Sequence, residues 1–336
     1  MTSQELTAWN TYNQHGLEII NAGLITQTEF RPMGISPTFD PLFLKRYMFF
    51  QGYLDGPLLV PNSFFFFGTG QEYNAWALGD TEINIILVNA HVIVGNTLFY
   101  ANCRTQIETV LKKLGISCTY DGGLPTVNVM RQLAEMYIFY HEVAHLIQMF
   151  ELPQLIPAIR DERFNTNQFD IIDHIAEVDA DLFASTKIAT HVLEIIGRDK
   201  RRHSIDAVYV ENLIVVVVSG FVLFRSLVLN HQLPFYTKAT RHPHTLIRIF
   251  VGIADLTHSI TQNSGYALDK KIVLDKVISC VENLCRIHPE ISRHSIFTDL
   301  SKKHISLIKG YYEELIGEVK LQSGTAYVKK GGLGNR

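Results

Sequence analysis

Residues 141–145 read His-Glu-Val-Ala-His, and this pentapeptide lies inside a long stretch without helix breakers. The run from Val127 to Phe150 contains neither glycine nor proline, and Pro125 stands where prolines often begin a helix. We therefore expect one long helix. Residues four apart share a helix face, so His141 and His145 point the same way. Apolar residues surround that face on most sides, which predicts a buried helix.

Two buried imidazoles one turn apart predict a metal site. An unpaired buried polar group costs ~1–3 kcal/mol, so both rings need partners. A zinc ion satisfies such a pair, and the intervening Glu142 is placed to take a proton from water at the metal. The pattern predicts His141 and His145 as zinc ligands and Glu142 as a catalytic base.

A zinc site of this kind needs a third protein ligand. Residues 169–184 have helical apolar spacing and place Glu177 and Asp181 one turn apart on one face. His174, one turn before Glu177, is an alternative ligand, whereas Asp179 points to the other side of the helix. Acidic pairs at this spacing are also typical of solvent-exposed helix faces, and that interpretation stays open.

A third segment, residues 240–249, reads Thr-Arg-His-Pro-His-Thr-Leu-Ile-Arg-Ile. The proline after His242 restricts that residue to extended conformations and suits the first turn of a following helix. His242 is therefore presented from a rigid helix entrance, as expected for a residue aimed into a cleft. The alternative is an ordinary helix start at which His242 and His244 face water.

The order HExxH, ExxxD and HPxxxxRI resembles the gluzincin metallopeptidases. The third element is similar to that of the CAAX prenyl protease and heat-shock membrane protease group. The whole order also resembles the soluble Lit-type phage-exclusion peptidases. The resemblance covers residues 124–262, and no motif is recognised in residues 1–110.

By this resemblance, Glu177 completes the zinc ligands, and Asp181 receives the outer N–H of His141 and fixes its tautomer. The resemblance implies a zinc-dependent endopeptidase that acts on a protein or peptide substrate. His242, Arg248 or Tyr140 would then supply a further donor to the oxyanion of the substrate. Arg248 has a structural alternative, in which it pairs a carboxylate near the site.

Elsewhere the sequence predicts helices and short strands. We expect helices or short helical elements over Ser3–Asn21, Phe43–Gln51, Thr97–Leu114, Asp269–Cys285 and Ser301–Lys320, and strands over Pro57–Val60, Ser63–Phe67, Tyr73–Leu78 and Glu82–Val88. This order indicates an α+β, zincin-like fold with a small, mostly antiparallel or mixed sheet before a mainly helical body. Its regions are residues 1–120, 121–262 (the zinc-binding core) and 263–336. An edge strand of the sheet is expected to bind extended peptide.

Composition agrees with a folded enzyme. The 336 residues are 47% hydrophobic and 19% charged, with a formal charge of −3, so a nucleic-acid partner is not expected. Four cysteines without a CxxC pair and a polar N-terminus indicate a cytoplasmic protein with reduced thiols. The apolar run Leu213–Phe224 is shorter than the ~20 residues of a membrane span, so we expect a buried helix, with membrane association as the alternative.

Two further function classes stay open. One is a zinc-dependent hydrolase of a non-peptide substrate, or a catalytically inactive relative, against which the intact Glu142 argues. The other is a helical protein-interaction module whose pentapeptide is coincidental. Metal content separates the second class from the enzymes, because an interaction module has no need of stoichiometric zinc.

Overall fold

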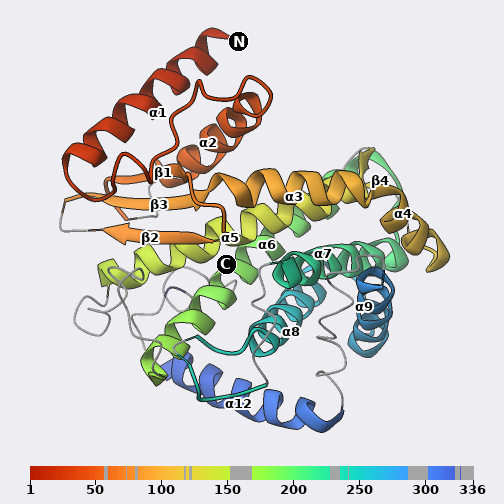
Figure 1. The fold of residues 1–336 in the computed structure, drawn as a ribbon. Helices are drawn as coiled ribbons and strands as arrows, with labels where there is room; N and C mark the ends of the chain where they lie inside the picture. The colour runs from red at the N-terminus through yellow and green to blue at the C-terminus, as the bar shows by residue number, and fades with distance from the viewer. Residues whose placement is uncertain are drawn as a thin grey trace. The chain divides into compact units, whose positions relative to one another are not determined.

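The computed structural model describes residues 1–56, 60–72, 74–79, 82–116, 119–120, 123–151, 169–227, 235–240, 242–286, 302–321 and 326. These residues are mostly helical and include a three-stranded and a two-stranded sheet (Figure 1). The element content agrees with the α+β class expected from the sequence. The finer expectation, a zincin-like arrangement, stays a prediction.

The chain divides into two compact units. The first comprises residues 1–96 and 142–165, and the second comprises residues 97–141 and 166–336. Two of the three divisions fall within continuous helices, α3 (Ala90–Asn102) and α5 (Thr126–Glu151), and the third, after residue 165, lies outside the described residues. The sequence-based regions 1–120, 121–262 and 263–336 stay a prediction.

The first unit holds a small mixed sheet. Its strands lie in the order β1-β3-β2, with β1 parallel and β2 antiparallel to β3. The predicted helix over Ser3–Asn21 is confirmed with the same bounds, and residues 57–59 of the predicted strand Pro57–Val60 lie outside the described residues. The elements of this unit are α1 (Ser3–Asn21), α2 (Asp40–Leu54), β1 (Ser63–Gly68), β2 (Ala75–Gly79) and β3 (Asn84–Asn89).

Side chains and a neighbouring segment occupy the outer edge of β1. The hydroxyl of Tyr12, a fully buried residue of α1, accepts a hydrogen bond from the Phe67 N–H at 3.1 Å. Gln51 of α2 accepts the Phe65 N–H at 2.9 Å, and the Arg31 N–H donates to the Phe67 carbonyl oxygen at 2.9 Å. An edge strand with its backbone groups already bonded offers no template for another chain. Within this sheet, β2 is therefore the remaining candidate for the expected strand addition.

The second unit is a body of helices. Figure 1 shows α6, α7, α8, α9 and α12 in this unit, and α6 packs on α8 and α12 while α7 packs on α8 and α9. The elements besides α3 and α5 are α4 (Arg104–Lys113), β4 (Thr119–Tyr120), β5 (Leu124–Pro125), α6 (Ile171–Arg202), α7 (Ala207–Leu227), α8 (Thr245–Asn263), α9 (Lys270–Cys285) and α12 (Lys302–Leu321).

The prediction of a single helix over Thr97–Leu114 is wrong. The structure has two helices there, because α3 begins at Ala90 directly after β3 and Cys103 separates it from α4 with φ −92° and ψ 4°. The sequence of residues 92–95, Val-Ile-Val-Gly, favours a strand and a turn over a helix. Burial of Val92 and Ile93 outweighs that local preference, since tertiary packing overrides propensity.

The apolar run Leu213–Phe224 is helical and buried, as expected. It lies in α7, where Gly220 allows close packing: a Cβ atom there would lie 2.9 Å from the Met130 Cβ. Among the described residues, Ala207–Arg225 is the one helix long and apolar enough to cross a membrane, and 78% of that window is buried. The buried core helix of a soluble protein can be equally long and apolar, so length and composition alone do not indicate a span.

Asp255 brings a carboxyl group into this helical core. It lies on α8 and is 8% exposed, and its Oδ2 has no hydrogen-bond partner among the described residues. Burial raises the pKa of the Asp255 carboxyl to about 7, against smaller lowering contributions from Thr186 and Lys320. Between about pH 4 and pH 7, the folded chain therefore holds a proton at Asp255 that the unfolded chain has lost.

We predict that the free energy of unfolding falls as the pH rises through this window, because the unfolded chain is stabilised by releasing its proton while the folded chain keeps it. Asp255→Asn removes that dependence, so its advantage in stability over the wild type should be ~3 kcal/mol larger at pH 8 than at pH 4.5, at ~1.4 kcal/mol per pKa unit. Urea unfolding at both pH values measures this, with the exposed Asp275→Asn as the control. The same difference in stability between Asp255→Asn and the wild type at both pH values would contradict the prediction.

Candidate metal centre

Helix α5 carries both histidines of the pentapeptide on one face. The helix is continuous from Thr126 to Glu151, and His141 and His145 are 7% and 2% exposed. Glu142, between them, is 5% exposed. The pentapeptide is therefore buried, as the apolar surroundings of the motif indicate.

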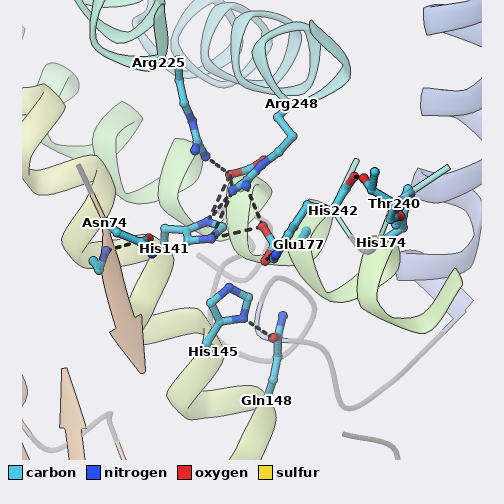
Figure 2. Close-up of polar contacts among 12 residues, drawn as sticks. Asn74, His141, His145, Gln148, His174, Glu177, Arg225, Thr240, His242 and Arg248 are labelled. Carbon is cyan, nitrogen blue, oxygen red and sulfur yellow. Dashed lines mark hydrogen bonds and ion pairs between the residues drawn. The ribbon is translucent and has the colours of Figure 1, made fainter. Parts of the chain in front are cut away.

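Glu177 of α6 joins the two histidines. One ligand atom each from His141, His145 and Glu177 lies within 4.8 Å of the others, and all three residues are buried. His141 Nε2 lies 3.5 Å from Glu177 Oε2, and Figure 2 shows the two side chains facing each other, joined by a dashed line. The structure thus brings together the three residues that the sequence predicts as metal ligands.

Asp181 lies one turn after Glu177 and contacts the other nitrogen of His141. The Asp181 Oδ1 is 3.0 Å from His141 Nδ1, and the Asp181 residue is fully buried. A hydrogen bond from Nδ1–H to this carboxylate leaves Nε2 of His141 with a lone pair for a metal.

Gln148 contacts the outer ring nitrogen of His145, as Asp181 contacts that of His141. Its Oε1 lies 2.8 Å from His145 Nδ1, and Gln148 is 1% exposed. An amide oxygen only accepts, so Nδ1 donates and Nε2 of His145 is left for a metal. The sequence reasoning missed Gln148. Its spacing of three residues after His145 on a helix was the available signal, because such pairs lie side by side.

Two arginines balance the buried charge of Asp181. Arg225 of α7 donates to Oδ1 at 2.6 Å, and Arg248 of α8 donates to Oδ2 at 2.8 Å. Tyr137 of α5 donates to Oδ1 at 3.0 Å. Burial by itself would raise the pKa of Asp181, but Arg248, Arg225 and the bond to His141 together hold it well below its usual range. Asp181 is therefore a permanent carboxylate.

Arg225 is the second residue that the sequence reasoning missed. It ends the apolar run of α7, and its guanidinium lies 5.3 Å from the centre of the Tyr137 ring. A charge that ends a buried apolar helix needs a partner inside the protein. The sequence therefore indicated that Arg225 has a buried partner, but it did not indicate which residue that partner is.

Arg248 bridges the two acidic residues of α6. Its Nη1 lies 2.7 Å from Glu177 Oε2, its Nε lies 2.8 Å from Asp181 Oδ2, and its Nη2 lies 3.1 Å from His141 Nε2. Burial would lower the pKa of Arg248, but Asp181 and Glu177 outweigh burial and raise it. In this structure Arg248 therefore has the carboxylate-pairing role that the sequence left as one of its two alternatives.

His242 reaches the same cluster from the chain before α8. Its Nδ1 lies 3.1 Å from Glu177 Oε1, and its side chain is 45% exposed, whereas that of Glu177 is 6% exposed. The next histidine, His244, caps α8 instead, and its Nδ1 accepts the Leu246 N–H at 3.1 Å. Of the two histidines flanking Pro243, His242 is the one at the cluster.

Three other residues weighed from the sequence have partners elsewhere. His174 is fully buried, and its two ring nitrogens lie 2.7 Å from the Thr240 carbonyl oxygen and 2.8 Å from the Tyr311 hydroxyl. The Tyr140 hydroxyl lies 2.6 Å from His191 Nε2. Asp179 accepts the backbone N–H of Ala326 at 2.8 Å, on the side of α6 away from Asp181.

The donor set fits a metal ion. Two imidazole nitrogens and one carboxylate oxygen are ligands that zinc commonly uses, and both rings have their outer nitrogen held by an acceptor. Burial of all three residues limits competition from solvent. The cluster can therefore hold a metal ion, and the donor types alone do not fix which one.

We predict that Gln148→Leu lowers the affinity for Zn²⁺, used as the probe, by ~10–100-fold, because His145 loses the acceptor that fixes its tautomer. Competition with a chromophoric chelator measures the dissociation constant. Gln132→Leu, a half-buried glutamine on the same helix, is the control. Unchanged affinity in Gln148→Leu would show that this amide has no influence on the metal.

Comparison with known proteins identifies no relative of this chain. No protein-family model, no curated protein and no solved structure matches the chain. The candidate metal centre therefore rests on the residues and geometry of the chain itself.

Proposed function

We propose that this chain is a zinc-dependent metallopeptidase that hydrolyses a protein or peptide substrate. The observation that supports this most directly is the buried group of His141, His145 and Glu177, in which each histidine has its Nδ1 bonded to an acceptor. In that tautomer each Nε2 carries the lone pair that a metal would bind; at His141 this atom lies 3.1 Å from Arg248 Nη2, which a metal would have to replace. The glutamate of the same pentapeptide, Glu142, supplies a base on that helix.

Zinc is the proposed metal because of the ligand types. A His₂Glu set with a water position left open is a recurrent catalytic zinc arrangement. When bound, the ion would act as a Lewis acid that makes water more acidic and stabilises negative charge on a carbonyl oxygen.

Glu142 has the role of general base in this proposal. Its carboxylate accepts a proton from the water that attacks the scissile carbonyl, and it returns this proton to the leaving amine. Glu142 is 5% exposed and lies on α5 between the two histidines, so the base is carried by the same helix as two of the candidate ligands. An inactive relative would have no chemical need for this side chain.

His242 is the proposed second catalytic residue. It is the most exposed side chain in the cluster, at 45%, and its Nδ1 lies 3.1 Å from Glu177 Oε1, so His242 is the member of the cluster that a substrate reaches most easily. A donor there would stabilise the developing oxyanion. Arg248 is not proposed for this role, because Glu177 and Asp181 already occupy its guanidinium.

We expect the purified protein to contain ~1 zinc ion per chain, and His141→Ala, His145→Ala and Glu177→Ala each to lose most of it, because each removes one protein ligand. Elemental analysis by mass spectrometry measures the content. His203→Ala, an exposed histidine at the end of α6, is the control. Full zinc content in all three ligand variants would refute the ligand assignment, and a wild type without zinc would favour the interaction-module alternative.

Glu142→Gln keeps the size and hydrogen-bonding reach of the side chain but removes the base. We expect this variant to keep its zinc and its stability while peptide hydrolysis falls by at least ~10²-fold. Digestion of a proteome-derived peptide library, followed by mass spectrometry, measures the cleavage rate. Glu151→Gln, at the end of the same helix, is the control. Undiminished cleavage by zinc-loaded Glu142→Gln protein would exclude the proposed mechanism.

A further inference from the structure

The chain before α8 forms an ordered segment, which we call the His242 segment (residues 235–240 and 242–244). The Thr240 hydroxyl lies 2.8 Å from both the Tyr236 hydroxyl and the His242 carbonyl oxygen. The Tyr236 ring also packs edge-on against His244, with 4.9 Å between ring centres. These contacts link the residues on both sides of His242, so the position of His242 follows from that of the segment.

His174 of α6 attaches this segment to the helical body. Its Nε2 lies 2.7 Å from the Thr240 carbonyl oxygen, which only accepts, so Nε2 carries the hydrogen. The Tyr311 hydroxyl, 2.8 Å from Nδ1, must then donate to that nitrogen. Both ring nitrogens are satisfied in one neutral tautomer, and the ring cannot turn over without losing both bonds. Tyr311 thereby fixes the tautomer that holds Thr240.

Helix α12 contacts the same segment at two further points. Lys238 forms an ion pair with Glu314 at 2.8 Å, and its ammonium lies 5.3 Å from the centre of the Tyr311 ring. The Phe235 ring packs on His304, with 4.7 Å between ring centres. Helix α12 therefore contacts the segment at Phe235 and Lys238 and reaches Thr240 through His174. The exposed ion pair contributes little by itself, so the buried bonds of His174 are the main attachment.

We infer that Tyr311 and His174 are positioning residues that hold His242 against Glu177. The connection runs from Tyr311 to His174, from His174 to the Thr240 backbone, and through the segment to His242, whose Nδ1 lies 3.1 Å from Glu177 Oε1. Neither positioning residue belongs to the metal ligands. This inference rests on the proposed function in taking Glu177 as a ligand, and it makes α12, more than 120 residues after Glu177 in the chain, a functional part of the metal centre.

A double-mutant cycle tests this connection. Tyr311→Phe removes the hydroxyl and keeps the ring, and we expect it to weaken Zn²⁺ binding by ~10-fold, because the partner of ligand Glu177 loses its fixed position. In a His242→Ala background the same change should have no further effect, since the residue through which it acts is gone. Tyr312→Phe, the neighbouring tyrosine whose ring packs on Phe250, is the control.

The cycle separates positioning from a general effect on the fold. Loss of folding stability alone would lower the affinity equally in both backgrounds, and that result would overturn the inference, as would wild-type affinity in Tyr311→Phe. A failure of the peptidase proposal would give a different result. Zinc-loaded Glu142→Gln protein would still cleave peptides, while Tyr311→Phe would still weaken Zn²⁺ binding only when His242 is present.

A second measurement needs no metal. The imidazole NMR signals of His242 in metal-free protein report the surroundings of this ring directly. We expect Tyr311→Phe to shift them and Tyr312→Phe to leave them unchanged. If the wild type bound no Zn²⁺, the peptidase proposal would fail while this measurement still decided the positioning role: His242 signals unchanged by Tyr311→Phe would overturn it.

Discussion

The buried carboxylate of Asp181 is the interaction on which the rest of the second unit depends. Asp181 belongs to α6, and it receives Arg225 from α7, Arg248 from α8, and Tyr137 and His141 from α5. A buried charge without partners costs several kcal/mol, and removing one partner of a buried pair typically costs ~3–5 kcal/mol. Four helices therefore have one preferred arrangement around a single carboxylate, and the candidate metal ligands are carried by two of them.

This cluster orients the candidate ligands before any metal is bound. Asp181 holds the His141 ring by its Nδ1, and Gln148 holds the His145 ring in the same way from within α5. Glu177 is restrained from two sides, by Arg248 at one carboxylate oxygen and by His242 at the other. Side chains fixed in this way lose little conformational freedom when they bind an ion, which favours tight binding. Arg248 also places a cation beside the ligands, which lowers the electron donation available from Glu177.

Helix α7 shows why composition alone is a poor guide to the surroundings of a helix. Its length and apolarity pass the test for a membrane span, yet most of it is buried within the protein. Its last turn carries Arg225, whose side chain is 12% exposed and paired with Asp181 at 2.6 Å. An apolar helix with a paired arginine at its end suits a protein core, where the charge has a fixed partner. The helix thus combines the packing of a core element with a direct contact to Asp181, beside the candidate metal ligands.

The sequence alone determined the local features of this protein. The spacing of apolar residues gave the helix that carries His141 and His145, and it gave the shared face of Glu177 and Asp181, because helical periodicity acts over a few residues. The partners of these residues were decided by the tertiary structure. Arg225 lies 44 residues from Asp181 in the chain, and no local pattern encodes so distant a pairing. The same reason explains why His174, a plausible ligand by spacing, bonds to Thr240 and to α12 instead: which buried groups meet depends on how whole helices pack.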